Sequence, residues 1–278
     1  MKVVTSVSGG KTSAYIAANY HSDYLVFALV RTNDKSVAFK DKYLKKMVED
    51  KLQCDFVGTL ESDTIISTMF DLEQYTGKKI DWVSGDLFED VIAKRKMIPN
   101  KMMRFCTTEL KMKPIFHWWA EKFSKEPVEM NIGYRVTEQR RAKKMLDNCN
   151  ENGLNEFKAT FGKHPDGRNK WEVVEWRKPK FPLIPDMIDQ HDIRGYWEDK
   201  PVRFSDFNNC IGCPNFTNNR LKYSSENYPD KFKWFINQEE HIKGTWKTNI
   251  TYKLIKNMPK QLDIFKGEIG CDSGFCGM

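Results

Sequence analysis

The sequence predicts an α/β fold with a doubly wound, mostly parallel sheet and a smaller, mainly helical, cysteine-containing C-terminal subdomain. In the first half of the chain, apolar runs of strand length alternate with segments of helical periodicity, an order typical of parallel sheets covered by helices. Beyond about residue 178 the sequence is punctuated by prolines, rich in aromatic residues and carries a Cys-x-x-Cys pair. We therefore expect an α/β domain over residues 1–178 and a cap or cofactor subdomain over residues 179–278.

The expected elements follow from the spacing of apolar residues. A near-continuous apolar run predicts a strand buried on both faces, and apolar side chains at spacings of three and four predict a helix packed on one face. In chain order we expect a strand over 2–7, a helix over 12–20, a strand over 24–30, a helix over 39–51, a strand over 54–60, a mainly helical segment over 65–119 and a strand over 128–133. The sheet is expected to end soon after this last strand.

Composition limits the class of protein. With 278 residues, 40% of them hydrophobic, the chain can bury the core of one large domain or of a domain with a cap. The apolar part of the N-terminus is too short for a signal peptide, and no apolar run approaches the roughly 18 residues of a membrane span. We therefore expect a cytoplasmic protein with no membrane partner.

Charge and cysteine content indicate the kind of ligand. The formal charge of +7, from 45 basic and 38 acidic residues, suits an anionic partner, although it does not separate a nucleotide from a nucleic acid or from an ordinary solvated surface. The seven cysteines are Cys54, Cys106, Cys149, Cys210, Cys213, Cys271 and Cys276. In a reducing compartment, clustered thiols in a chain of this length indicate metal binding or catalysis rather than disulfides.

The turn after the first strand has the features of a phosphate-binding loop. Its residues are Ser8, Gly9, Gly10, Lys11, Thr12 and Ser13. A Gly-Gly pair between a strand and a helix lets backbone N–H groups converge on an anion, and the helix N-terminus adds partial positive charge. The three hydroxyls can donate to phosphate oxygens and the lysine adds a full charge. A Walker A loop is excluded because Thr5 stands where that motif needs its first glycine.

This loop is similar to the Ser-Gly-Gly-x-Asp-Ser signature of the PP-loop, or adenine-nucleotide α-hydrolase, superfamily, with Thr12 in the place of the aspartate. The resemblance implies a Rossmann-like sheet of the HUP type and an adenine-nucleotide ligand. It also implies that the loop grips the phosphates of that nucleotide.

Four further segments resemble the branch that contains phosphoadenosine-phosphosulfate (PAPS) reductases and related phage and DNA-sulfur-modification proteins. Residues 104–115 resemble its Arg-x-Cys-Cys-x-x-x-Lys-x-x-Pro-Leu segment, and residues 132–141 its Ile-Gly-x-Arg segment. Residues 181–184 resemble the stretch before its helical region, and residues 209–214 its Cys-x-x-Cys segment. These four matches stand in the family's order and, together with the loop, cover about residues 1 to 215.

The resemblance and the positions of residues at strand ends together predict nucleotide contacts outside the loop. Arginines after a strand end suit phosphate or sulfate oxygens, because ligands of open α/β sheets bind at the carboxyl ends of strands. The candidates are Arg31 and Thr32 after the second strand, where family members hold adenine and ribose by backbone contacts, and Gly133, Arg135, Arg140 and Arg141 after the last predicted strand.

The cysteines allow more than one metal group. Cys210 and Cys213 have metal-ligand spacing. In cluster-bearing relatives two adjacent cysteines join this pair to hold a [4Fe-4S] cluster; here Cys106 matches the first of them and Thr107 replaces the second. Cys271 or Cys276 completes the cluster, or one iron stays open and binds sulfide. Alternatively, the last four cysteines hold structural Zn²⁺ and Cys106 is a free thiol near the nucleotide.

Three functions are compatible with these features. The first is ATP-dependent activation, in which Lys11 and Mg²⁺ offset the charge of the pyrophosphate, an acceptor is adenylated with release of PPi, and a sulfur donor displaces AMP. The second is reduction of PAPS or adenosine phosphosulfate to sulfite with a thioredoxin-like reductant, with Cys276 as nucleophile. The third is a non-catalytic nucleotide-binding subunit, which Thr12 favours. The acceptor (tRNA, DNA or a metabolite) and the oligomeric state stay open.

Overall fold

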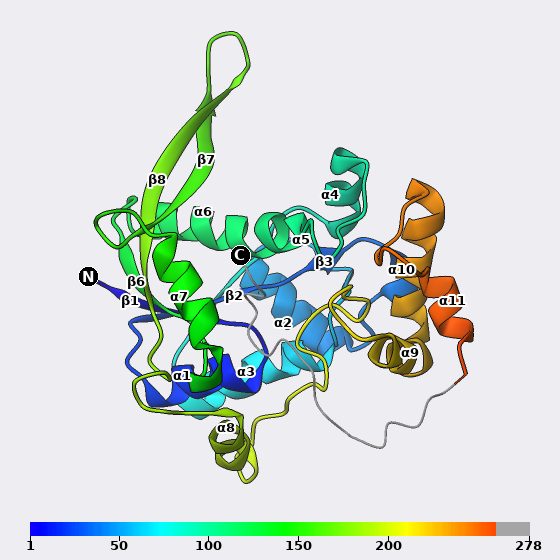
Figure 1. Cartoon of the computed structure of the whole chain (residues 1–278), viewed down its shortest axis with the longest axis horizontal. Coiled ribbons are helices and arrows are strands. Elements are labelled where there is room, and N and C mark those ends of the chain that lie inside the picture. The colour runs from blue at the N-terminus through cyan, green and yellow to red at the C-terminus, as the bar shows by residue number, and fades with distance from the viewer. Residues whose placement is uncertain (260–278) are drawn as a thin grey trace.

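A six-stranded, mostly parallel sheet forms the centre of the molecule, in a computed structural model that describes residues 1–259 (Figure 1). The strand order is β5-β2-β1-β6-β8-β7, and only β7 runs antiparallel to its neighbour. The strands are β1 (Val3–Val7), β2 (Tyr24–Ala28), β5 (Ile80–Val83), β6 (Val128–Asn131), β7 (Asn155–Lys163) and β8 (Asn169–Lys180). The α/β class expected from the sequence is confirmed.

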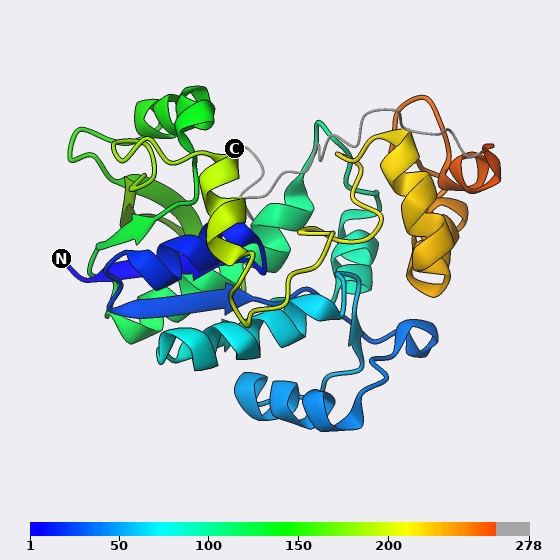
Figure 2. The same cartoon turned by 90° about the horizontal axis from the view of Figure 1, so that it is seen from below.

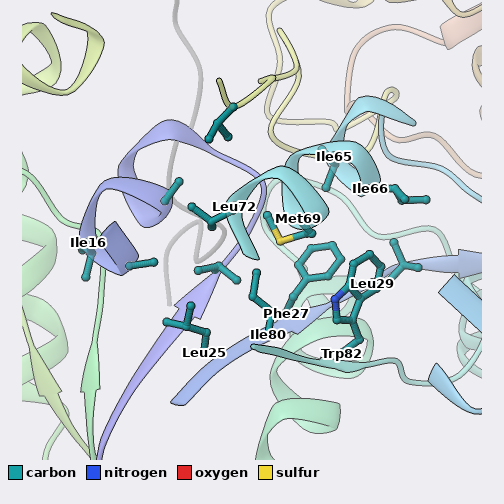
Figure 3. Packing of buried hydrophobic residues seen from close by; sticks show 14 of the residues in the cluster. Ile16, Leu25, Phe27, Leu29, Ile65, Ile66, Met69, Leu72, Ile80 and Trp82 are labelled. Atoms are coloured by element: carbon teal, nitrogen blue, oxygen red, sulfur yellow. The ribbon is translucent and has the colours of Figure 1, made fainter. Parts of the chain in front are cut away.

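Helices cover both faces of this sheet, and further helices pack beyond its edge (Figure 1). They are α1 (Lys11–Asn19), α2 (Lys42–Leu52), α3 (Thr64–Thr76), α4 (Phe88–Arg95), α5 (Phe105–Thr107), α6 (Lys113–Lys122), α7 (Gln139–Asp147), α8 (Gln190–Trp197), α9 (Asn218–Asn227), α10 (Pro229–Ile242) and α11 (Tyr252–Asn257). Alternate residues of β2 point to opposite faces. Leu25 and Phe27 pack with α1 and α3 (Figure 3), whereas Val26 and Ala28 pack with α6.

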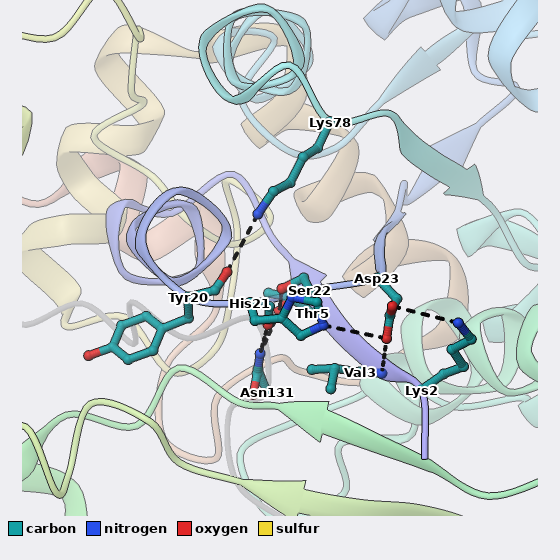
Figure 4. Close-up of polar contacts among 9 residues, drawn as sticks. All are labelled: Lys2, Val3, Thr5, Tyr20, His21, Ser22, Asp23, Lys78 and Asn131. Carbon is teal, nitrogen blue, oxygen red and sulfur yellow. Dashed lines mark hydrogen bonds and ion pairs between the residues drawn. The ribbon is translucent and has the colours of Figure 1, made fainter.

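The sheet has its topological switch point between β1 and β6. From β1 the chain moves through α1 to β2 on one side, and it later returns to β6 on the other side of β1. A buried hydrogen bond joins the two strands, because Asn131 Nδ2 donates to Thr5 Oγ1 at 3.0 Å; the Thr5 hydroxyl also lies 2.6 Å from that of Ser22, just before β2 (Figure 4). In open α/β sheets, ligands bind at the carboxyl ends of the strands at this point.

The third strand of the sheet is not the one expected over residues 54–60. That segment contributes only β4 (Gly58–Thr59), which pairs antiparallel with β3 (Arg31–Thr32) outside the main sheet. Its apolar side chains are explained by packing, because Phe56 and Leu60 are buried in two different core clusters. The strand that pairs with β2 is β5, inside the segment expected to be mainly helical; it is only four residues long and carries Asp81 in its middle.

The expectation that the sheet ends soon after residue 133 is also wrong. β8 pairs in parallel with β6, and the β7–β8 hairpin extends the sheet by two strands. All residues from 161 to 171 are exposed, so the outer half of the hairpin has mostly polar side chains and lacks the apolar run that marks a buried strand.

The chain after β8 packs in two places. Leu183, Ile193 and Trp197, the last two on α8, join the core cluster of α1 and α3. Helices α9 to α11 pack with α4 in a second cluster that includes Phe88 and Trp234. The boundary predicted after residue 178 falls within β8 and stays a prediction. None of the helices in residues 1–259 is both long and apolar enough to cross a membrane.

Candidate functional site at the carboxyl edge of the sheet

The Gly-Gly loop (residues 8–13) lies at the switch point, where β1 ends and α1 begins. Gly9 has a φ of +78°, a conformation that residues with a Cβ rarely adopt. No side chain caps the first turn of α1, and no acidic residue lies in it. The first backbone N–H groups of a helix have no partner within that helix. The loop therefore presents amides and a partial positive charge of the kind that bind phosphate.

Hydroxyl contacts hold this loop closed. The Ser13 hydroxyl donates to the carbonyl oxygen of Gly10 and accepts from the backbone N–H of Ser8, both at 3.1 Å. The hydroxyls of Ser8 and Ser13 are themselves 3.1 Å apart. The carbonyl oxygen of Lys11 accepts from Trp197 Nε1 at 3.0 Å, which ties α8 to the loop. Within residues 1–259 the Lys11 ammonium has no hydrogen bond or ion pair, so its charge is available to an anion.

The end of β6 lies against the start of α1. A Cβ on Gly133 would stand 3.2 Å from Thr12 Cγ2, so the two segments are in close contact and Thr12 is buried between them. Arg135 follows two residues later and is also buried; its Nε donates to Glu138 Oε2 at 3.0 Å. The structure thus brings Gly133 to the loop and places Arg135 at the same strand end; their contact with a nucleotide stays a prediction.

Three other predicted contacts lie elsewhere. The Arg31 guanidinium donates to Cys54 Sγ at 3.1 Å and to two backbone carbonyl oxygens, so it ties neighbouring loops together. Thr32 is fully buried and its hydroxyl donates to Glu89 Oε1 at 3.2 Å. Arg140 is exposed on α7. The side chains of Arg31 and Thr32 are thus engaged within the protein. These residues could contact a nucleotide through their backbone, as the resemblance implies.

Three of the predicted metal-ligand cysteines converge, although Cys106 lies about 100 residues before the other two in the chain. Cys106, Cys210 and Cys213 are partly buried against one core cluster. Burial, and then the neighbouring Cys213 thiol, raise the pKa of Cys106 to about 11. Burial raises the pKa of Cys210 well above its ordinary value, and both other thiols add to this shift. The three sulfurs therefore lie close enough to interact.

A buried ion pair that the sequence did not reveal adjoins these thiols. Lys111 Nζ lies 2.6 Å from Glu61 Oε1, and Glu61 is fully buried. Burial opposes the charge of Lys111, but Glu61 outweighs it and the pKa of the ammonium is raised. Glu61 Oε2 and the hydroxyl of buried Ser62 have no hydrogen-bond partner in the described structure. Lys111 belongs to the segment that resembles the PAPS reductase branch, whereas no sequence signal marks Glu61.

Residues 60–65 connect the thiols to the loop. The backbone N–H of Ile211, within the Cys-x-x-Cys segment, donates to the carbonyl oxygen of Leu60 at 2.8 Å. Five residues further on, Ile65 in the first turn of α3 lies against Gly9, where an added Cβ would come within 2.6 Å of its Cγ2. The candidate phosphate site and the thiols thus share one connecting segment at the carboxyl edge of the sheet.

The described residues do not complete a metal site by themselves. Within residues 1–259, no group of three or more His, Cys, Asp and Glu side chains is arranged to hold a metal ion. Cys271 and Cys276, the predicted remaining ligands, lie outside the described residues, as does the nucleophile role assigned to Cys276. Thiolates are the soft donors that iron–sulfur clusters and zinc prefer, so the chemistry of Cys106, Cys210 and Cys213 suits such a group although their arrangement in the described residues does not form its site.

Comparison of the chain with protein-family models, with curated proteins and with solved structures finds no match.

Proposed function

We propose that the protein binds the phosphates of an adenine nucleotide on the Gly-Gly loop. The observation that carries this proposal is the N-terminus of α1, which begins at the switch point without a side-chain cap or an acidic residue and beside the free ammonium of Lys11. Backbone amides would bind the phosphate oxygens, and Lys11 would offset their charge. Gly133, packed on Thr12, leaves the adjoining strand end without a side chain.

The reaction that we favour is adenylation followed by sulfur transfer. An acceptor oxygen attacks the α-phosphorus of ATP, the bond to the β-phosphate breaks, and PPi leaves with Mg²⁺. A sulfur nucleophile then attacks the activated acceptor atom, and AMP leaves with the acceptor oxygen. The protein's own residues bind and orient the triphosphate, and fixed amides stabilise the charge that develops on the leaving PPi. The free Lys11 favours ATP, because loops of the resembling reductases usually lack this lysine.

The three converging thiols support a thiolate-bound group next to this site. Cys106, Cys210 and Cys213 would supply three ligands, and Cys271 or Cys276 the fourth; structural Zn²⁺ on the Cys210–Cys213 pair and the last two cysteines is the alternative. In the other arrangement, a [4Fe-4S] cluster held by the first three cysteines alone would keep an open iron, which would bind sulfide as the sulfur source. Lys111 would balance the negative charge of the thiolates.

Two other functions remain alternatives. A PAPS or adenosine phosphosulfate reductase would use the same phosphate contacts and a thiolate nucleophile, and would release sulfite with a thioredoxin-like reductant. A non-catalytic nucleotide-binding subunit is favoured by Thr12, which is packed against Gly133 where the resembling signature has an aspartate for Mg²⁺.

The test is nucleotide binding and turnover by anaerobically purified protein. We expect ATP with Mg²⁺ to bind more tightly than PAPS, and Lys11→Met to weaken ATP binding at least tenfold. Lys42→Met, which removes an exposed lysine of α2, serves as the matched control and should have no effect. Release of PPi with a candidate acceptor supports the enzyme, sulfite release from PAPS supports the reductase, and binding without turnover supports the subunit. Absence of any nucleotide binding would overturn all three.

A further inference from the structure

The β7–β8 hairpin projects from the sheet beyond the helices that cover it (Figure 1). Its base belongs to the core, because Trp176 is buried with α6. In its outer half every residue from 161 to 171 is exposed, although Phe161 still contacts the body of the protein through Phe116, His117 and the ammonium of Lys125. This half contributes little to the core, so its composition is not explained by folding.

The two faces of the hairpin differ. The inner face packs on α6, where Phe157 stacks on Phe116 with ring centroids 4.6 Å apart. The outer face carries two large apolar side chains in water, Trp171 at 58% and Val173 at 63% exposure. Lys158, which pairs with Val173 across the hairpin, holds its ammonium 6.0 Å from the centre of the Trp171 ring. An aromatic ring beside a cation on an open strand surface is a platform for nucleic-acid bases.

Charge on the outer half complements phosphate. Residues 161–171 hold three cations, Lys163, Arg168 and Lys170, and one carboxylate, Asp166, which pairs with Arg168, so the net charge is 3 − 1 = +2; Lys158 adds a further cation on the outer face. The next carboxylate, Glu172, lies 3.6 Å from Lys125 of the protein body. At the base, Glu175 and Glu156 accept hydrogen bonds from Asn150.

A second cationic surface, on α7, adjoins the base of the hairpin. Arg140, Lys143 and Lys144 are exposed, and their spacing places them on one face of this helix. None of the three has an ion pair with another described residue. The C-terminal end of α7 contacts the hairpin, since Asn155 Nδ2 donates to the carbonyl oxygen of Met145 at 3.4 Å. Its N-terminal end follows Arg135 at the candidate nucleotide site.

We propose that the outer face of the hairpin and the cationic face of α7 form a binding surface for single-stranded nucleic acid, with bases stacked on Trp171 and phosphates on the lysines and arginines. This surface runs from the hairpin tip to the start of α7, beside the Gly-Gly loop. It identifies the acceptor as a nucleic-acid strand, a conclusion that rests on the proposed function.

Binding is measured by fluorescence anisotropy on the full chain, without nucleotide, using labelled 20-nucleotide strands of one mixed sequence as DNA and as RNA, and the corresponding duplexes. We expect either strand to bind more tightly than its duplex; the comparison of DNA with RNA identifies the sugar. Trp171→Ala should weaken binding about 5- to 100-fold, the range for loss of one stacked base. Trp171→Phe should restore most of it. Tyr43→Ala, which removes an exposed aromatic ring from α2, is the matched control.

The contribution of α7 is measured by the salt dependence of binding. The triple variant with Arg140, Lys143 and Lys144 changed to Gln should lower the slope of log K against log salt by about 2, because each lost phosphate contact on a single strand contributes about 0.7. The control changes Lys40, Lys42 and Lys46 to Gln, an equal loss of charge on exposed residues. In Figure 2 the α2 region lies on the opposite side of the molecule from α7.

The proposal would be overturned if the hairpin and α2 variants changed the affinity for single strands equally. It would also be overturned if duplexes bound most tightly and Trp171→Ala had no effect, or if no strand bound at all. The outcome is independent of the proposed chemistry. Strand binding that depends on Trp171, in a protein that neither binds nor turns over ATP, would retain the surface and remove the adenylation. ATP turnover without strand binding would retain the adenylation and remove the nucleic-acid surface.

Discussion

Replacing Gly9 by alanine adds two costs that can be worked out separately. The backbone at Gly9 has a φ of +78°, and holding a residue with a Cβ in this region costs about 1–2 kcal/mol. The new Cβ would also stand 2.6 Å from Cγ2 of Ile65, a fully buried side chain, and overpacking of this kind costs about 1–3 kcal/mol. We expect Gly9→Ala to lower the free energy of unfolding by about 2–5 kcal/mol.

Two variants separate these costs. Gly77, which caps the C-terminal end of α3, has a φ of +65° and no atom within 4 Å of an added Cβ. Gly77→Ala should therefore show the backbone cost alone, about 1–2 kcal/mol. Ile65→Ala removes the clashing atoms but leaves a cavity that itself costs about 2–5 kcal/mol. In the double variant with Gly9→Ala the new methyl group fills part of this cavity, so the two changes should couple favourably by about 1–3 kcal/mol.

Urea unfolding at equilibrium measures the stabilities, and calorimetry with ATP and Mg²⁺ measures binding. Gly9→Ala should bind ATP at least tenfold more weakly than wild type because the amides of the loop are displaced, whereas Gly77→Ala should bind normally. The contact with Ile65 would be refuted if the two glycine variants lost the same stability and no coupling with Ile65→Ala were found. Full ATP affinity in Gly9→Ala would refute the loop as the phosphate site.

Three further substitutions test the buried ion pair of Lys111, the ion pair of Asp71 and the metal-ligand role of Cys210. Lys111→Met should cost about 3–5 kcal/mol of unfolding free energy, because it leaves the buried Glu61 carboxylate unpaired; Glu61→Gln in that background should recover part of it. Hydrogen bonds from Arg203 lower the pKa of Asp71, so the stability it adds is present above its ordinary pKa of about 3.9 and is lost as the pH falls through the lower folded value; unfolding of Asp71→Asn should depend less on pH below about 4. Cys210→Ser should lower bound iron, sulfide or zinc in anaerobic elemental analysis.

Each of these changes has its own control. Cys54→Ser removes an exposed thiol and should leave the metal content unchanged; equal metal in the Cys210 variant would exclude that residue as a ligand. Asp50→Asn removes an exposed carboxylate of α2 and should keep the acid sensitivity of wild type. A neutral effect of Lys111→Met would show that the Glu61 carboxylate is protonated or solvated.

The first strand, turn and helix were predictable because their signals are local. A β-branched run, two glycines and a helical pattern follow one another within 20 residues, and the structure has β1, the loop and α1 in that order. The Cys210–Cys213 spacing is equally local. The ion pair of Glu61 with Lys111 was not predictable, because it joins residues 50 positions apart and neither spacing nor composition marks a glutamate that folding will bury.

Strands were missed where burial and sequence pattern disagree. β5 is four residues long and one of them, Asp81, is charged. This carboxylate is tolerated because Trp118 Nε1 donates a hydrogen bond to it at 3.1 Å. The segment over 54–60 has the opposite character: Phe56 and Leu60 are apolar because they fill two cores, but the backbone between them pairs only at β4. Hydrophobic runs report burial, and only tertiary pairing determines whether a buried run is a strand.

If the proposed function is correct, the position of the thiols is explained better by a reaction than by nucleotide binding alone. A sensor needs only the phosphate loop, whereas this fold also buries the Glu61 carboxylate with one oxygen unpaired in the described structure, next to Cys210. Leaving a buried polar atom without a partner costs about 1–3 kcal/mol, and replacing Glu61 by an apolar residue would remove that cost. Lys111 stabilises negative charge beside three thiols only if it is itself held in place, and Glu61 holds it at 2.6 Å. Under the proposed function, the pair would position a cation beside the thiolates that a metal group requires, one short segment away from the candidate phosphate site.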